Sequence, residues 1–173
     1  MVYNLNVSVT ILNKKGTGVI GARLFVSVPA WELYEVVLDI RNFPRWAPGI
    51  QHVEVVKGPP GPGMISEWEV SFLGLKRKIS SVLKEAERPT LLRWTYEGFI
   101  RGRGQCVLKD WGDIALAEFR MELHTAEPAL ERLLRTPVAR SAATRHLKRT
   151  LACLGQVVSG DGEARVGPLE GDF

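Results

Sequence analysis

Side chains capable of chemistry are scattered along this chain, and none falls into a familiar catalytic or metal-binding spacing. His52, His124 and His146 lie far apart, and Cys106 and Cys153 form no CxxC pair, so neither a zinc site nor a disulfide framework is indicated. The sequence contains no G-x-S-x-G motif, no phosphate-binding P-loop and no dinucleotide fingerprint. We therefore expect no metal and no cofactor, and any chemistry must come from single polar side chains on apolar strand faces.

Three polar residues share a predicted strand face with large apolar residues: Ser66, Arg77 and Tyr96. They are the candidates for a catalytic role. A buried arginine needs an ion-pair partner or an anionic ligand, so Arg77 is the most informative of the three. The alternative for Arg77 is a bent strand that turns its side chain to water.

Large side chains predominate on the same predicted inner faces, beside the small Gly102 and Gly104. The set comprises Trp68, Phe72, Trp94, Tyr96, Phe119 and Met121. A sheet that only packed on a helix would be filled by aliphatic side chains. Rings beside glycines leave irregular space, whereas the alternative is that the rings simply fill the core.

The elements that must position these residues can be read in order along the chain. Tyr3 to Ile11 alternates strictly and predicts a strand, which could form a hairpin with a second strand over 19–28. A short helix is expected over 30–38, and Asp39 can cap a second one that Pro44 and Pro48 end. Further alternation between short turns predicts an antiparallel meander with strands at 50–57, 64–72, 75–85, 91–97, 102–109 and 115–123.

Residues 127–154 carry the only long helical pattern, with leucines recurring at three- and four-residue steps and arginines mostly between them. Pro128 suits the first turn, and Gly155 is a natural stop. Pro137 interrupts the pattern, and we expect a kink there rather than a break. Two helices meeting at Thr136 are the alternative, and a bend that opens space between helix and sheet is the functional interpretation.

This order of elements resembles the START-like helix-grip (SRPBCC) superfamily, which includes the polyketide cyclase/dehydrase and coenzyme Q-binding families. The resemblance is carried by VPA at 28–30, LYEVVLD at 33–39, NFPRWAPGI at 42–50, KG at 57–58 before a Pro/Gly loop, and the long terminal helix. It implies an α+β fold in which a curved antiparallel sheet wraps around a long C-terminal helix, with two short helices after the first core strand. We expect an extra strand and turn over 1–17, the helix-grip domain over 18–156 and a disordered tail over 157–173. The extra strand could be an added edge strand or a dimer contact.

The resemblance also implies an apolar ligand in the gap between the sheet and the C-terminal helix, and it favours a cavity over a filled core. The residues expected to line it are Trp46, Trp68, Val70, Phe72, Trp94, Tyr96, Phe119, Met121, Leu133, Pro137 and Val138. Residues near Trp46 and the Pro137 kink would gate entry. In the aromatase relatives, pocket Arg, Tyr and Ser side chains are implied to polarise carbonyls or move protons. Arg77, Tyr96 and Ser66 are the side chains of those types here, although no relative's catalytic role is carried onto them.

Composition narrows the possible partners. A net charge of +4 and a pI of about 9.3 are mildly basic, and the clustered basic-aromatic motifs of nucleic-acid modules are absent. The basic helix face suggests transient contact with an anionic membrane surface, although a solvated face explains it equally well. No apolar run is long enough to span a bilayer, and no basic flank precedes an apolar stretch at the N-terminus, so a cytoplasmic location is expected. Oligomeric state stays open.

Three functions follow from these expectations. The leading hypothesis is binding of a hydrophobic small molecule, such as a lipid, an isoprenoid quinone or a polyketide-like compound, for transport or presentation. The second is an enzyme of the cyclase/dehydrase type, which Arg77 and Tyr96 converging on a pocket would favour and an all-apolar pocket would disfavour. The third is a partner-binding module, which predicts a small, filled cavity and an exposed apolar patch.

Overall fold

The computed structural model describes residues 8–11, 19–72 and 74–160. Its elements follow in the order β1 (Ser8–Ile11), β2 (Val19–Val26), α1 (Ala30–Leu38), the 3₁₀ turn η1 (Ile40–Asn42), α2 (Phe43–Trp46), β3 (Ile50–Lys57), β4 (Ile65–Phe72), β5 (Leu75–Glu87), β6 (Leu91–Gly98), β7 (Ile100–Asp110), β8 (Ala115–Thr125), α3 (Pro128–Leu134) and α4 (Pro137–Val158). Each meander strand predicted from alternation is present, with ends shifted by up to two residues.

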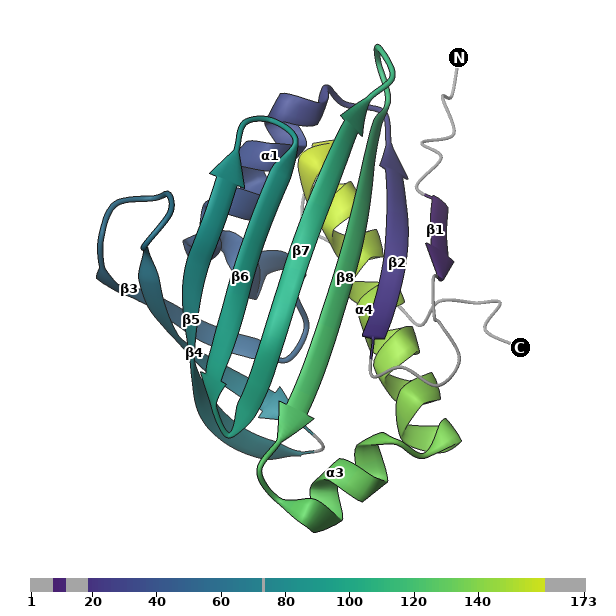
Figure 1. Ribbon diagram of the computed structural model, residues 1–173. Coiled ribbons are helices and arrows are strands. Elements are labelled where there is room, and N and C mark those ends of the chain that lie inside the picture. The colour runs from purple at the N-terminus through teal and green to yellow at the C-terminus, as the bar shows by residue number, and fades with distance from the viewer. Residues whose placement is uncertain (1–7, 12–18, 73, 161–173) are drawn as a thin grey trace.

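The strands form one antiparallel sheet in the order β1-β2-β8-β7-β6-β5-β4-β3 (Figure 1). Strands β3 to β8 pair with their sequence neighbours, as their short connections require. Strand β2 instead pairs with β8, from Val19 opposite Glu122 to Val26 opposite Ala115. With a long C-terminal helix and short helices after β2, this is the predicted α+β helix-grip architecture.

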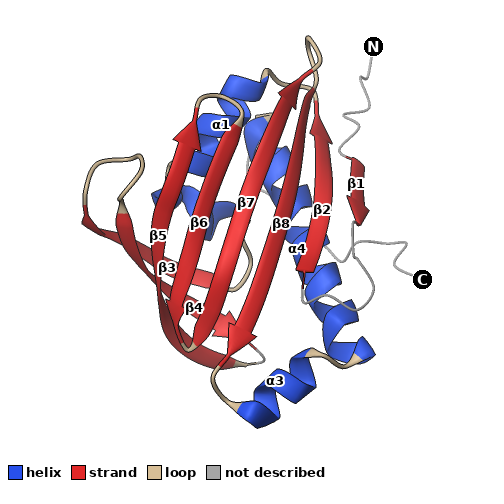
Figure 2. Cartoon of the chain, viewed as in Figure 1, coloured by secondary structure: helices blue, strands red, loops and turns tan. Residues whose placement is uncertain are grey.

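The helices α1, α2 and α4 share one face of the sheet, behind the strands in Figure 2. Helix α4 lies mainly against β2 and also reaches β1 and α2. Its buried positions Leu147, Leu151 and Leu154 recur at three- and four-residue steps, as the sequence pattern predicts. A single buried apolar cluster joins this helix to α1 and to the inner face of the sheet.

The predicted N-terminal strand is present in part. Strand β1 pairs antiparallel with β2, with Ser8 opposite Phe25 and Ile11 opposite Ala22, so the expected hairpin partner is confirmed over these residues. Strand β1 stands at the end of the sheet as an added edge strand. Residues 3–7 of the predicted strand lie outside the described part of the chain.

The segment after α1 differs from prediction in its capping. Asp39 makes no side-chain capping bond to the next turn; its carboxylate accepts from the Arg41 guanidinium at 2.9 Å and from the Asn42 amide at 3.1 Å. Pro44 lies in the first turn of α2 instead of ending it, which its missing N–H allows. The expected second short helix therefore exists as η1 followed by α2.

The expected kink at Pro137 is wrong: α3 ends at Leu134, and α4 begins anew at Pro137. A residue before proline is driven out of the helical region, and Thr136 has an extended backbone with φ −68° and ψ 148°. Its hydroxyl donates to the Leu133 carbonyl at 2.7 Å and accepts from the Ala139 N–H at 3.2 Å. One side chain thus closes one helix and opens the next. At its other end α4 runs to Val158, two residues into the expected tail.

Trp94 explains why position 104 is a glycine. The two residues lie opposite each other on β6 and β7. A Cβ atom added to Gly104 would stand 2.4 Å from Cε2 of the Trp94 indole, so the ring occupies the space that a side chain would need. At this position the ring fills the space beside the glycine, which is the alternative to the irregular space expected from the sequence.

We expect Thr136→Ala to lower the free energy of unfolding by about 1 kcal/mol, because it leaves the first turn of α4 without its cap. Thr136→Ser keeps the hydroxyl and should retain most of the stability, and Thr150→Ala on exposed α4 surface should have little effect. Urea unfolding measures all three. Equal losses for Thr136→Ala and Thr150→Ala would contradict the capping role.

We expect Gly104→Ala to destabilise the protein by about 1–3 kcal/mol, because the added methyl group displaces the Trp94 indole. A double-mutant cycle supplies the control: in a Trp94→Leu background the same change should cost far less. If the cost of Gly104→Ala is the same in both backgrounds, the indole contact is not its cause.

Candidate ligand cavity

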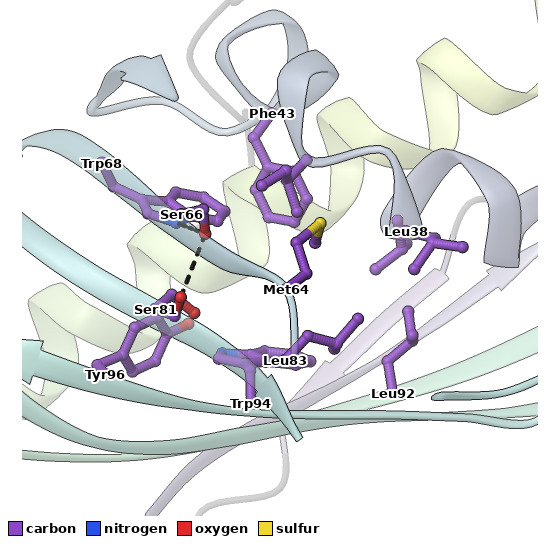
Figure 3. A pocket seen from close by; sticks show the side chains of 12 residues that line it. Leu38, Phe43, Met64, Ser66, Trp68, Ser81, Leu83, Leu92, Trp94 and Tyr96 are labelled. Carbon is purple, nitrogen blue, oxygen red and sulfur yellow. Dashed lines mark hydrogen bonds between the residues drawn. The ribbon is translucent and has the colours of Figure 1, made fainter. Parts of the chain in front are cut away.

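A cavity of about 40 Å³ lies between the sheet and the short helical segment that follows β2 (Figure 3). Its twelve lining residues are Val37 and Leu38 of α1, Ile40 of η1, Phe43 of α2, Met64, Ser66 and Trp68 at β4, Ser81 and Leu83 of β5, and Leu92, Trp94 and Tyr96 of β6. None of them belongs to α4. This location differs from the expected gap between the sheet and the C-terminal helix, because α4 packs on the β2 side of the sheet.

The cavity wall is apolar and aromatic, with no charged side chain among its lining residues. The Phe43 ring meets the Trp68 ring edge-on, with centroids 4.8 Å apart, and the Trp94 and Tyr96 rings are also roughly perpendicular, at 6.4 Å. Met64 and Leu38 face each other across the space, with Leu83 and Leu92 below them in Figure 3. Apolar contact therefore dominates what this space can offer a ligand.

The hydroxyl-bearing side chains of the lining form a row across three neighbouring strands. Ser66 of β4 lies opposite Ser81 of β5, and Ser81 lies opposite Tyr96 of β6. Directly paired residues on one face have Cβ atoms about 5 Å apart, so the three hydroxyl-bearing side chains are neighbours. The row continues to Gly102 on β7, whose φ of +153° and close approach to the Glu122 carbonyl exclude a side chain.

Hydrogen bonds distinguish the members of this row. The Trp68 indole N–H donates to the Ser66 hydroxyl oxygen at 2.8 Å, and the Ser66 hydroxyl donates to the Ser81 carbonyl at 3.5 Å (Figure 3). The hydroxyl of Ser81 has no partner among the described residues. Ser66 is thus engaged by the protein itself, whereas Ser81 keeps its hydrogen-bonding capacity.

Tyr96 is the one titratable group in the cavity wall. Burial raises the pKa of its phenol to about 12, and the indole N–H of Trp94 opposes that rise by stabilising the phenolate. The phenol therefore stays protonated at neutral pH. An indole N–H can only donate, so the Trp94 ring cannot accept from Tyr96, whose phenolic O–H remains a donor.

The predicted catalytic candidates are divided by the structure. Ser66 and Tyr96 both line the cavity. The expectation of a buried Arg77 is wrong: its side chain is exposed, donates to the Lys76 carbonyl at 3.0 Å and stands 5.0 Å above the centre of the Phe99 ring. The alternative of a water-facing Arg77 side chain holds.

Among the predicted ligand-lining residues, Trp68, Trp94 and Tyr96 lie in the wall. Trp46 does not line the cavity; it is buried beside Phe43, which does, and their ring centroids are 4.2 Å apart. The remaining inner-face residues, Val70, Phe119 and Met121, pack in or against the core and do not line this cavity. The side chain of Phe72 lies outside the described set.

The three predicted lining residues near the start of α4 are far more exposed to solvent. Leu133 is 46% exposed and Val138 78% exposed, and Pro137 is also exposed. These positions do not line the cavity. Their exposure is what contact with a membrane surface would require, and that contact stays a prediction.

Sequence reasoning missed eight lining residues: Val37, Leu38, Ile40, Phe43, Met64, Ser81, Leu83 and Leu92. A signal existed for two of them, because Met64 alternates with Ser66 and Ser81 falls between the inward Ile79 and Leu83. Nothing in the periodicity of α1 indicated that its Val37 and Leu38 would face a cavity, since a buried helix face looks the same over a cavity and over a filled core.

The described residues show no second site suited to chemistry. Three buried polar atoms lack a partner there, the Tyr34 hydroxyl, the Trp46 indole nitrogen and the Thr95 hydroxyl, and none of their residues lines the cavity. Within the same ranges no three His, Cys, Asp or Glu side chains gather as metal ligands would. No helix in this part of the chain has the length and apolar character needed to cross a membrane.

Solved structures show the same architecture at low sequence identity. Protein TTHA0849 from Thermus thermophilus has a TM-score of 0.72 and 18% identity, over 83% of this chain and 99% of its own. A START superfamily protein from Mycobacterium smegmatis has a TM-score of 0.70 and 14% identity, over 82% and 97%. The Zhui aromatase/cyclase from Streptomyces sp. R1128 has a TM-score of 0.62 and 18% identity, over 88% and 98%. At these identities the likeness establishes the fold alone.

Among curated proteins, none matches this sequence. The model of one protein family does, with the description "polyketide cyclase / dehydrase and lipid transport", and the match runs over residues 22–159. That span includes every helix of the structure and all strands that form the cavity floor. The resemblance suggested by the sequence is confirmed, and this chain belongs to the polyketide cyclase/dehydrase and lipid transport family.

Proposed function

We propose that the protein binds a hydrophobic small molecule, such as a lipid, an isoprenoid quinone or a polyketide-like compound, in the cavity between β4–β6 and the α1–α2 segment. Transport or presentation of that molecule is the use we infer. The observation that carries the proposal is the cavity wall itself, which is aromatic and aliphatic with three hydroxyl groups and no charge. Burial of apolar surface would supply the affinity, and the hydroxyls would fix orientation.

The size of the cavity requires that binding enlarge it. A water molecule needs about 10–15 Å³ of such space, and a cavity that admits benzene measures about 150 Å³. At about 40 Å³ the present space holds a few waters at most. The strand side is fixed by the β4–β5 and β5–β6 ladders. The yielding side is therefore the short α1–η1–α2 segment with Met64, whose unbranched side chain repacks easily.

A cyclase-type enzyme is the first alternative, and it has weaker support. The family description includes cyclases and dehydrases, and Tyr96 offers a phenol inside the cavity. Convergence of Arg77 and Tyr96 was the arrangement that would favour catalysis, but the Arg77 guanidinium stands outside over Phe99. A reaction in this cavity would have to rely on hydroxyl groups alone.

A partner-binding module is the second alternative, favoured by the small cavity together with exposed aromatic side chains. Trp31 at the start of α1 is 57% exposed, and Trp111 in the β7–β8 turn is 62% exposed. Single exposed apolar residues are common on soluble proteins, so these two do not by themselves outweigh the cavity.

We expect Leu92→Ala to strengthen binding of a two-ring hydrocarbon, naphthalene, by about 10-fold or more, because deleting three carbons from the wall makes room for the ring. Isothermal titration calorimetry measures the affinity. Native mass spectrometry of the unmodified protein, purified without detergent, would show any ligand that is already bound.

Leu151→Ala is the matched control. Leu151 is as deeply buried as Leu92, at 1% against 2% exposure, but lies on α4 outside the wall. Both variants should lose about 2–5 kcal/mol of stability, so a gain in binding for Leu92→Ala alone identifies the cavity. Equal gains, or no binding to either variant, would remove the ligand-binding proposal and leave the partner-binding module ahead.

A further inference from the structure

The sheet side of the cavity, formed by β4, β5 and β6, carries one line of hydroxyl groups, from Ser66, Ser81 and Tyr96. Apolar side chains lie on both sides of this line. On one side of Ser66, Ser81 and Tyr96 the next inward pair is Trp68 opposite Ile79. On the other side it is Leu83 opposite Trp94. A ligand lying against the sheet meets hydroxyl groups along one line and apolar surface elsewhere.

The row has hydrogen-bonding capacity left over for a ligand. Ser66 is engaged by the Trp68 indole and by the Ser81 carbonyl. The phenolic O–H of Tyr96 is a donor that the Trp94 indole cannot accept, and the hydroxyl of Ser81 has no partner among the described residues. A hydroxyl proton that faces an apolar cavity is stabilised by an acceptor on the ligand.

The same lining residues disfavour a charged ligand. None of the residues lining the cavity is charged. Arg77 stands two residues before Ile79 on β5, and its guanidinium is exposed. A carboxylate or an ammonium group in this space would lose its hydration without gaining an opposite charge.

From this geometry we infer that the cavity selects a neutral ring compound carrying an oxygen that accepts hydrogen bonds from Tyr96 and Ser81. Carbonyl, quinone and phenol oxygens belong to this class, whereas fatty acids and other ionised ligands do not. The inference rests on the proposed function and narrows it. Tyr96 and Ser81 are then residues that determine specificity, and Ser66 positions the Trp68 ring.

Four compounds of similar size test it: acetophenone, which is neutral with a carbonyl; cumene, which is neutral without oxygen; benzoate, an anion; and benzamidinium, a cation. Nuclear magnetic resonance can follow binding at the indole N–H signals of Trp68 and Trp94. The exposed Trp31 and Trp111 are internal references, because their signals should not move. Each compound is titrated into the intact protein and, to admit the ring where the native cavity stays closed, into Leu92→Ala.

We expect acetophenone and cumene to shift the cavity signals, and benzoate and benzamidinium to bind at least about 100-fold more weakly than acetophenone. Tyr96→Phe should weaken acetophenone about 3- to 10-fold and leave cumene unchanged. Ser81→Ala should act in the same direction. Tyr34→Phe is the matched control, since it removes a buried, unpartnered hydroxyl outside the cavity, and it should change neither affinity.

The outcomes separate the inference from the proposed function. If both neutral compounds bind and Tyr96→Phe affects them equally, or if a charged compound binds as well as acetophenone, the hydrogen-bonding row is not a specificity device, while hydrophobic binding stands. If none of the four compounds moves the Trp68 and Trp94 signals in either background, both the inference and the proposed function are overturned.

Discussion

The pairing of β2 with β8 is the contact on which the rest of the structure depends. It joins strands that lie far apart in the sequence, and a long meander must be closed before it can form. Because the two strands run antiparallel, α1 leaves β2 at one end of the ladder and α3 leaves β8 at the other. Helix α4 therefore returns along β2, while α1 packs on β7 and β8 and the η1–α2 turn packs on β3. The cavity lies between this segment and β4 to β6.

That division gives the cavity two walls of different chemistry. The sheet wall carries all three hydroxyl groups, and its geometry is fixed by strand register. The helical wall, formed by Val37, Leu38, Ile40 and Phe43, is wholly apolar. A fixed wall can recognise an oxygen at a defined place, whereas an apolar wall can shift without leaving a polar group unpaired. Specificity and adaptability are thus assigned to different elements.

Period-two alternation predicted the sheet and with it Ser66, Trp68, Trp94 and Tyr96, because strand residues two apart share a face regardless of what covers it. Which part of that face is covered depends on contacts distant in sequence. Alternation could not show that the Arg77 side chain is exposed, or that Leu133 and Val138 are exposed where α3 meets α4. The helix break was accessible in principle, because a threonine before proline both leaves the helical region and supplies a cap.

The same geometry bears on how a ligand would enter. Pro137 starts a helix whose first residues are exposed, and neither it nor any other α4 residue lines the cavity. Trp46 is placed differently: its ring packs on Phe43, which lines the cavity and meets Trp68 across it. An outward movement of the α1–α2 segment, which the proposed binding requires, would have to rearrange this stack. Of the two positions expected to gate entry, Trp46 adjoins the cavity wall through Phe43 and Pro137 does not; gating itself stays a prediction.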